Sequence, residues 1–411
     1  MTPSFTQLNT IRGLDSGPLC PFAQPYIALL QGQGYQPKTV REHLRLIASL
    51  NRWLVHRRRG LRDLDEHVIA RFLKRHLRRR KAWCGALPAM HRLLDILRKT
   101  GVTPPAKVIP LTPAQRLADQ YRQYLLRERG CAEETVENYV RHVDRFLARR
   151  LGSERDDLTT LRACEVTEFV QRNARDHNPP QTKQVITALR SFLRYLHYCG
   201  CIPKDLSPTV PAVAHWRLTG LPKHLPAEAV RAVLEGCEQT SALGRRNFAI
   251  LLLLARLGLR AGEVVSLRLE DIDWDHAHLM IRSRKGRGLA RLPLPADVGR
   301  AIVQYLKEGR PRCGCRNLFV RADAPHAPLS GSAVISGIVM RAIQKAGVAA
   351  PHTGAHVFRH SLATTMLGRG ASLDEIGQVL RHQDPDTTAI YAKVQLGALR
   401  PLALPWPGGD R

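Results

Sequence analysis

The segment NFAILLLLARLG (247–258) is apolar on nearly every side of the helix that it predicts. A helix that is apolar all round must be surrounded by protein, so we expect it to be central, buried and ended by Gly258. The apolar run from Ala249 to Ala255 is far shorter than the ~20 residues that cross a bilayer, so no membrane span is expected. Further helices must therefore pack around this segment.

The residues on either side of this helix predict its surroundings. The segment PAEAVRAVLEGC (226–237) has the spacing of an amphipathic helix. By contrast, HLMIRSRKGRGLARLPLP (278–295) alternates on both sides of a glycine-containing turn, which is typical of a β-hairpin. The remaining residues return to helical spacing. The fold class predicted for this part of the chain is therefore mainly α with a small β-hairpin or sheet.

The N-terminal half contains an internal similarity at an offset of 96 residues. Two stretches, 26–54 and 121–150, share six identical residues at this offset, and each is followed by an apolar helix that ends in glycine. Each stretch, together with the residues up to that glycine, therefore predicts a bundle of roughly four helices. Duplication is one interpretation, and chance similarity between amphipathic helices is the other. The matched residues are Leu29, Leu30, Gly34, Thr39, Val40 and Arg45 with Leu125, Leu126, Gly130, Thr135, Val136 and Arg141.

Two proline-rich stretches, 102–113 and 201–226, punctuate the chain. Proline fixes φ and lacks an N–H donor, so these stretches predict extended connectors. They divide the chain into predicted domains at 1–105, 113–203 and 222–395, followed by a tail at 396–411. The tail holds spaced leucines and a Pro-Trp-Pro sequence. A local core role and docking on a neighbouring copy are both open for it.

The composition is strongly basic, with 63 Lys and Arg against 35 Asp and Glu, a net charge of +28 and a pI near 10.6. Such a balance favours a polyanionic partner, because Lys and Arg displace counterions from nucleic acid. The alternative is a basic protein with no such partner. Arginine runs at 57–60 and 71–81 place much of this charge in the first predicted domain.

The nine cysteines are scattered, and no secretory leader is visible, so a reducing cytoplasm is expected. Two C-x-C pairs are present, but zinc ligands are more often separated by two to four residues. We interpret the pairs Cys199/Cys201 and Cys313/Cys315 as structural thiols and predict no metal site.

The stretch from His356 to Val394 carries polar residues at fixed spacings. His356 and Arg359 lie three residues apart, so they share a helix face. Ser372 and Glu375 form a capping box for the next helix, and Asp384 with Pro385 predict the start of the last one. These caps fix the positions of His382, in the turn between the helices, and of Tyr391, near the end of the last helix.

Two further cations lie upstream. Arg260 follows the buried helix by two residues, beside a hydrophobic core, where an arginine needs an anionic partner. Glu263 is the predicted partner and orients Arg260. Lys285 lies at the tip of the predicted hairpin, where neighbouring glycines permit close approach to a ligand.

Together these residues resemble the tyrosine recombinase (phage integrase) family, in particular site-specific integrases of mobile elements. The resemblance covers 222–395 and extends to 113–200, which is similar to the family's helical core-binding domain; 1–105 is an additional, core-binding-like unit. It implies N-terminal helical DNA-binding bundles followed by a catalytic domain. The motifs are GLRAGEV, the hairpin lysine, H-x-x-R-H, and LRH with a tyrosine nine residues on; the site residues they imply are Arg260, Lys285, His356, Arg359, His382 and Tyr391.

The resemblance implies a nucleophilic role for Tyr391, which would attack a DNA phosphodiester and leave a 3′-phosphotyrosine and a free 5′-hydroxyl. The two arginines would bind the non-bridging oxygens of the phosphate. His356 and His382 would donate hydrogen bonds to the same oxygens, and His356 is a candidate to accept the tyrosine proton. Lys285 would protonate the leaving oxygen. No metal or nucleotide cofactor is implied.

The implied partner is double-stranded DNA, bound by a homo-oligomer (a tetramer on two DNA sites) or by an assembly with related recombinases. One alternative is an enzyme similar to type IB topoisomerases, which share the tyrosine chemistry. Another is a non-catalytic DNA-binding regulator, against which the complete residue set argues. His360 is adjacent to Arg359, so we expect it to face away from the site and to be structural.

Overall fold

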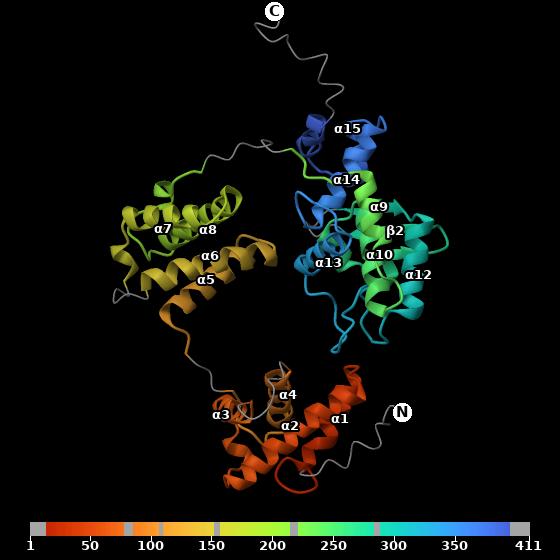
Figure 1. Cartoon of the computed structure of the whole chain (residues 1–411). Coiled ribbons are helices and arrows are strands. Elements are labelled where there is room, and N and C mark those ends of the chain that lie inside the picture. The colour runs from red at the N-terminus through yellow and green to blue at the C-terminus, as the bar shows by residue number, and fades with distance from the viewer. Residues whose placement is uncertain are drawn as a thin grey trace, which may run out of the picture. The chain divides into compact units, whose positions relative to one another are not determined.

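The computed structural model describes residues 14–77, 85–106, 110–151, 157–213, 221–282 and 288–394 (Figure 1). The chain divides into two compact units, Met1–Ala106 with Gly220–Arg411, and Lys107–Thr219. In the described ranges the fold is helical with one three-stranded antiparallel sheet, which confirms the predicted fold class. No described helix is long and apolar enough to cross a membrane.

The first bundle is built from amphipathic helices with a core of leucine, isoleucine and aromatic side chains. A buried polar cluster lies within it, because the Tyr26 hydroxyl bonds Nδ1 of His43 at 2.7 Å and donates to the Ala89 carbonyl. Its α-helices are α1 (Ala23–Gly32), α2 (Pro37–His56), α3 (Glu66–Leu77) and α4 (Ala86–Lys99), with short 3-10 helices at Cys20–Phe22 and Leu61–Asp63.

The second bundle has its own core, centred on Tyr121, Phe146 and Phe192. Thr112 opens its first helix with a capping box to Gln115. Its α-helices are α5 (Pro113–Arg127), α6 (Glu133–Leu151), α7 (Ala163–Asp176) and α8 (Pro179–Tyr198), with 3-10 helices at Leu158–Thr160 and Ser207–Thr209.

The two bundles follow the pattern predicted from the internal similarity. Each has four α-helices among its described residues, in a matching order along the chain. Val40 and Val136, which the offset of 96 residues pairs, are both fully buried. Phe72 and Phe169, which match after a slip of one residue, are buried too. The shared valine therefore occupies a core position in both copies, whereas the paired Arg45 and Arg141 are exposed.

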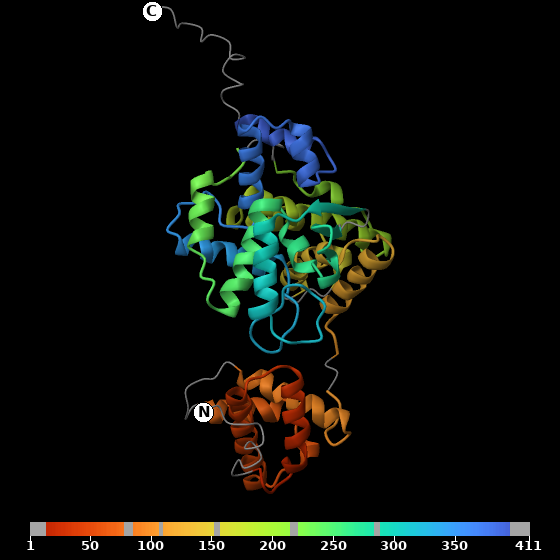
Figure 2. The ribbon, with the colours of Figure 1, turned by 90° about the vertical axis from the view of Figure 1, so that its right-hand side faces the viewer.

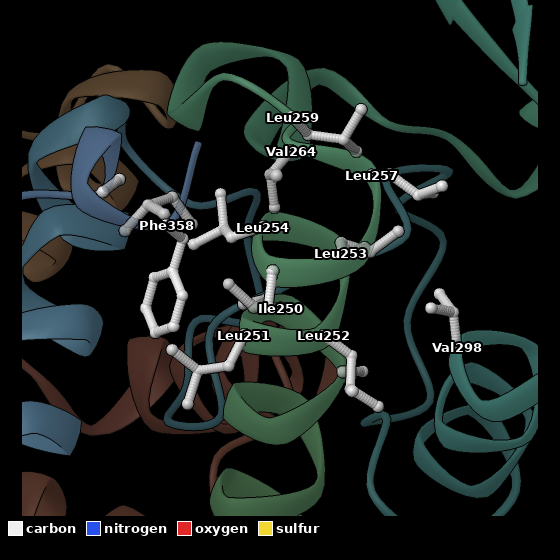
Figure 3. Packing of buried hydrophobic residues seen from close by; sticks show 14 of the residues in the cluster. Ile250, Leu251, Leu252, Leu253, Leu254, Leu257, Leu259, Val264, Val298 and Phe358 are labelled. Carbon is white, nitrogen blue, oxygen red and sulfur yellow. The ribbon is translucent and has the colours of Figure 1, made fainter. Parts of the chain in front are cut away.

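The C-terminal part is arranged around α10, whose side chains are buried on nearly all sides, as predicted (Figure 3). Helix α12 lies alongside it in both views (Figures 1 and 2), and α14 contributes Phe358 to the same core. The helices are α9 (Ala227–Glu235), α10 (Ala242–Leu257), α11 (Ala261–Ser266), α12 (Ala296–Glu308), α13 (Ser332–Lys345), α14 (His356–Gly368), α15 (Leu373–Leu380) and α16 (Asp386–Ala389), with 3-10 helices at Leu269–Asp271 and η7 (Ile390–Val394).

The predicted hairpin is present as β2 (His278–Arg282) and β3 (Leu289–Pro293), which pair antiparallel. A short strand, β1 (Ile272–Asp273), pairs with the other edge of β2 and completes the sheet. Leu279 and Ile281 point from β2 into the core, because alternate residues of a strand face the same side. The hairpin tip, 283–287, and with it Lys285, lies outside the described residues.

Candidate active site

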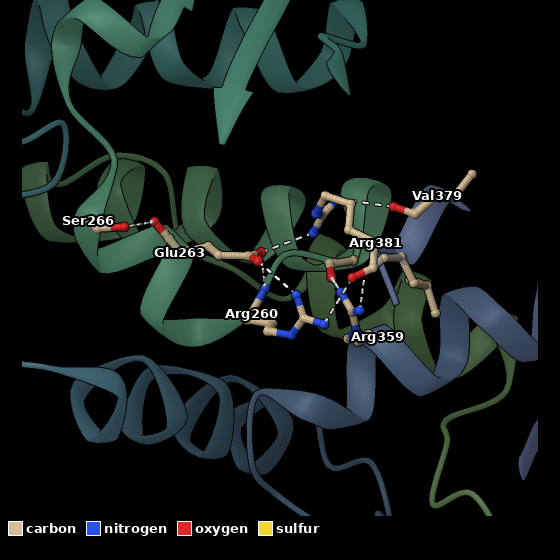
Figure 4. Close-up of polar contacts among 8 residues, drawn as sticks. Arg260, Glu263, Ser266, Arg359, Val379 and Arg381 are labelled. Carbon is tan, nitrogen blue, oxygen red and sulfur yellow. Dashed lines mark hydrogen bonds and ion pairs between the residues drawn. The ribbon is translucent and has the colours of Figure 1, made fainter. Parts of the chain in front are cut away.

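The site begins where α10 ends. Gly258 caps this helix in the left-handed conformation (φ +56°), and a Cβ at this position would lie 2.8 Å from a methyl of Leu380. Nη1 of Arg359 donates a hydrogen bond to the Gly258 carbonyl at 2.5 Å, and Nη2 donates to the Leu380 carbonyl (Figure 4). Arg359 is only 4% exposed, so main-chain oxygens fix its guanidinium inside the protein.

Arg260 is held beside it from α11. The Glu263 carboxylate accepts from the Arg260 backbone N–H at 2.8 Å and from its Nη1 at 2.9 Å, which confirms the predicted orienting contact. Nη2 of Arg260 also donates to the Arg381 carbonyl at 3.3 Å. The Arg260 side chain is 41% exposed whereas that of Glu263 is 9% exposed. Arg260 is thus oriented by a buried carboxylate and remains accessible to an anion.

Arg381 is a third cation of the site; it is the arginine of the LRH motif, but sequence analysis gave it no role. It caps α15 in the left-handed conformation (φ +56°), an uncommon one for a residue with a Cβ. Its Nη2 donates to the second carboxylate oxygen of Glu263 at 3.0 Å (Figure 4). Burial raises the pKa of Glu263, but Arg381 and Arg260 outweigh this effect and lower it below its usual value, so Glu263 is ionised.

The cap predicted for α15 is confirmed, whereas the predicted start of the last helix is displaced by one residue, with Pro385 rather than Asp384 as the N-cap of α16. Ser372 and Glu375 form the expected capping box of α15. Helix α16 begins at Asp386, and the Asp384 carboxylate accepts from the Asp386 backbone N–H at 3.0 Å. In the turn between them, His382 bonds the Thr388 hydroxyl through Nδ1 at 2.7 Å.

Tyr391 lies in η7, directly after α16, and is only 2% exposed. Its ring packs with Leu367, Ile376 and Leu380 in a small cluster, and lies parallel to the ring of His382 with centroids 6.5 Å apart. Burial raises the pKa of the Tyr391 phenol, while the nearby Arg359 opposes this change. The phenol is therefore protonated near neutral pH.

The prediction that His360 faces away from the site is wrong. Its Nδ1 lies 3.0 Å from the Tyr391 hydroxyl, within hydrogen-bonding distance. The reason is helical spacing: His360 follows Arg359 by one residue but follows His356 by four, which places the two histidines one turn apart on one face. Their ring centroids are 6.4 Å apart.

Five of the six predicted site residues thus come from three separate parts of the chain and gather at one place. Arg260 follows α10, His356 and Arg359 begin α14, and His382 and Tyr391 flank α16. The sixth, Lys285, is outside the described residues. With Glu263 ionised, the three arginines leave an excess of positive charge that suits one phosphate. Among the described residues, no cluster of His, Cys, Asp and Glu could hold a metal ion.

The histidines of the site are held neutral. Burial, with Arg359 and Arg260 nearby, lowers the pKa of His382 to about 4. Burial, together with His356 and Arg359, lowers that of His360 to about 4. Burial also lowers the pKa of His356, and Arg359 adds to the effect.

These shifts predict a pH-dependent stability. Below pH 6.5 the unfolded chain protonates His360 and His382, whereas the folded chain does not until about pH 4. The unfolded state then binds more protons, so the free energy of unfolding should fall as pH drops from 6.5 towards 4. Urea unfolding in a buffer series measures it. In the double variant His360→Asn, His382→Asn, the free energy of unfolding should depend less on pH. An identical pH dependence in wild type and double variant would contradict the low pKa values of these two histidines.

Comparison with known proteins agrees with the family resemblance that the sequence motifs indicate. Residues 223–396 match the family described as "Phage integrase family", and 118–198 match "Phage integrase, N-terminal SAM-like domain". The integrase/recombinase-type protein y4rA of Sinorhizobium fredii is 40% identical over 95% of both chains. Tyrosine recombinase XerD of Listeria monocytogenes is 30% identical over 68% of this chain and 94% of its own.

Solved structures share the fold. XerH site-specific recombinase, in a post-cleavage complex with its difH substrate, aligns with a TM-score of 0.55 at 18% identity over 70% of this chain and 84% of its own. A lambda integrase (75–356) dimer bound to a core site aligns with a TM-score of 0.52 at 18% identity over 67% of this chain and 94% of its own. The chain belongs to the phage integrase family of tyrosine recombinases.

Proposed function

We propose that this protein is a site-specific DNA recombinase, acting as an integrase or transposase of a mobile element, that cleaves and rejoins DNA through a 3′-phosphotyrosine at Tyr391. The observation that carries the proposal is the position of Tyr391 beside Arg359 and His382. Arg260, from a distant part of the chain, lies near both of these residues. A buried phenol near arginines, with a pKa shifted by its surroundings, is typical of a functional group. A phosphodiester placed between them would meet both a nucleophile and its charge stabilisers.

In this proposal the two guanidiniums bind the non-bridging phosphate oxygens. Their geometry is set beforehand by Glu263 and by main-chain carbonyls, so little reorganisation accompanies the reaction. His382 is bonded at Nδ1 to Thr388, which leaves its Nε2 for the same oxygens. His356 donates to them as well, and Lys285 protonates the leaving 5′-oxygen. The phosphotyrosine conserves the energy of the broken bond, and no cofactor takes part in the proposed cycle.

The competing activity is relaxation of DNA by an enzyme of the type IB topoisomerase kind. A recombinase exchanges strands between two duplexes, whereas a topoisomerase reseals the strand that it cut. The wild-type protein, incubated with two labelled duplexes carrying the element's end sequences, should form a Holliday junction on a native gel. Relaxation of supercoiled plasmid with no junction would support the topoisomerase, and binding with neither product would support a regulator.

We further propose that residues 1–105 form an additional DNA-binding domain and that 113–203 and 222–395 act as core-binding and catalytic domains. The support is the internal similarity, together with the exposed basic residues Arg57 and Arg58 at the end of α2 and Arg71 and Lys74 on α3. A homotetramer on two DNA sites, or an assembly with related recombinases, would complete the reaction in the cytoplasm. The tail, 396–411, lies outside the described residues.

Deleting residues 1–105 should shorten the footprint on DNA and flatten the salt dependence of binding. Each phosphate that this domain no longer neutralises lowers the slope of log K against log salt by about 0.9, because fewer counterions are released. Footprinting and binding titrations at several salt concentrations measure both effects. A truncated protein with the full footprint and the full slope would instead point to a protein-interaction role for this domain.

A further inference from the structure

The hydrogen bond of Tyr391 indicates a role for His360, to which the family resemblance assigned none. The Tyr391 hydroxyl lies 3.0 Å from Nδ1 of His360, and the two rings have centroids 5.7 Å apart. Sequence reasoning named His356 as the candidate proton acceptor, but the phenol is bonded to the next histidine of the same helix face.

Both partners of this hydrogen bond are held in place. His360 lies in the first half of α14, between the buried residues Arg359 and Ser361. Tyr391 is packed into the cluster formed by α14 and α15 and is almost fully buried. Neither ring can move far without opening this cluster, so the contact belongs to the folded arrangement of α14 and η7.

The protonation state of His360 suits an acceptor. The groups that face it are His356 and Arg359 on α14, His224 before α9, His352 before α14, and Tyr391 on η7. Burial is the first cause of its low pKa, and the cations and histidines around it act in the same direction. The imidazole is therefore neutral near pH 7, and one ring nitrogen carries a free lone pair for the phenolic O–H.

We infer that His360 accepts the phenolic proton of Tyr391 as the tyrosine oxygen attacks phosphorus, an inference that depends on the proposed recombinase function. A bond forms between Oη of Tyr391 and phosphorus, and the bond between phosphorus and the 5′-oxygen breaks. The phenolic proton moves to Nδ1 of His360, and the leaving oxygen takes a proton from the ammonium of Lys285. In rejoining, the 5′-hydroxyl gives its proton to the neutral Lys285 amine and attacks phosphorus. The bond between phosphorus and Oη of Tyr391 breaks, and His360 returns its proton to the phenolate.

The bound phosphate makes this transfer feasible. In the free protein burial disfavours a charged imidazolium at His360, and His356 and Arg359 add to this effect. A phosphate bound by Arg260 and Arg359 would neutralise part of that charge, which raises the proton affinity of His360 when DNA is in place. His360 is therefore a stronger proton acceptor with substrate bound than without it. His356, one turn earlier, keeps the role of a donor to the phosphate oxygens.

The test compares His360→Asn with wild type in single-turnover cleavage of a nicked suicide duplex by the full chain. The Asn Oδ1 stands close to the place of Nδ1, so it can accept the hydrogen bond but not the proton. We expect DNA binding to be unchanged and the cleavage rate to fall by about 10²–10⁴-fold, the usual contribution of general acid–base catalysis. His276→Asn, at an exposed histidine far along the chain, is the matched control and should cleave at the wild-type rate.

A second measurement separates proton transfer from positioning. Fluorinated tyrosine at position 391 has a more acidic phenol and needs its acceptor less. It should restore the rate of the Asn variant by about tenfold or more, while it leaves the wild-type rate little changed. His360→Asn should also slow the rejoining of a preformed adduct, because the residue that accepts the proton during cleavage donates it during rejoining.

The outcomes are distinct. Cleavage by His360→Asn at close to the wild-type rate, or a slow rate that fluorination does not improve, would overturn the inference. A wild-type protein that forms no adduct at Tyr391 would overturn the proposed function instead. Circular dichroism and urea unfolding establish that each variant is folded. If Asn unfolds the chain, His360→Gln takes its place and is judged by the same fluorination result.

Discussion

Tyr391→Phe should bind DNA as the wild type does and form no covalent adduct. The substitution removes one oxygen and keeps the ring that packs against Leu367, Ile376 and Leu380. Binding depends on the basic surface of the protein, which this change leaves intact. The substitution removes the nucleophilic oxygen, so we expect complete loss of the covalent adduct. Trapping on a nicked suicide substrate, followed by a denaturing gel, measures the adduct, and mass spectrometry of the wild-type product should place the nucleotide on the peptide that contains Tyr391.

The control for this experiment is Tyr198→Phe, at an exposed tyrosine at the end of α8. It should form the adduct at the wild-type level. Tyr391→Phe should also unfold at the urea concentration of the wild type or slightly below it, because His360 is the hydrogen-bond partner that the Tyr391 hydroxyl has among the described residues. An adduct that persists in Tyr391→Phe, or one mapped to another residue, would refute the assignment of the nucleophile.

Arg359→Lys should lower the cleavage rate by about 10²–10³-fold while DNA affinity changes little. The wild-type guanidinium donates to the carbonyls of Gly258 and Leu380 at the same time, which fixes its position. A lysine keeps the charge but is a point charge on a flexible stem, so it cannot reproduce the two fixed contacts. Single-turnover cleavage and a binding titration, carried out on the same preparation, separate the two effects.

Arg316→Lys is the matched control, because that arginine is exposed and pairs with Glu270 away from the site. It should cleave at the wild-type rate. Arg359→Lys should also lose stability, since the two carbonyls that it leaves behind are buried. If the lysine variant cleaves as fast as the wild type, charge alone suffices at this position and the fixed geometry of Arg359 has no catalytic importance.

Local patterns in the sequence predicted local structure well. The apolar run of 247–258 predicted a buried helix ended by Gly258, and the structure has this helix and this cap. Ser372 and Glu375 predicted their capping box, and the alternation in 278–295 predicted β2 and β3. In each case the physical cause lies within a few neighbouring residues. The third strand, β1, was missed because two residues carry no readable alternation.

Contacts between distant residues were beyond sequence reasoning. Arg381 joins Glu263 across 118 positions, and nothing in the sequence around either residue indicates this pair. His360 was misplaced for a different reason: its direction was measured from Arg359 alone. Counting from His356 would have placed it on the site's face, but which ring then reaches Tyr391 depends on how η7 packs against α14.

The main chain holds Arg359, and together with the Glu263 carboxylate it also holds Arg260. The carbonyls of Gly258, Leu380 and Arg381 receive hydrogen bonds from Arg359 and Arg260. A carbonyl is the same group in every amino acid, so a substitution cannot remove it as long as the backbone keeps its path. Lineages of this chain, or a laboratory selection for a new DNA target, can therefore exchange many surface side chains without dismantling the anion-holding frame. The choice of DNA target can therefore change during evolution while the residues that carry out the reaction keep their positions.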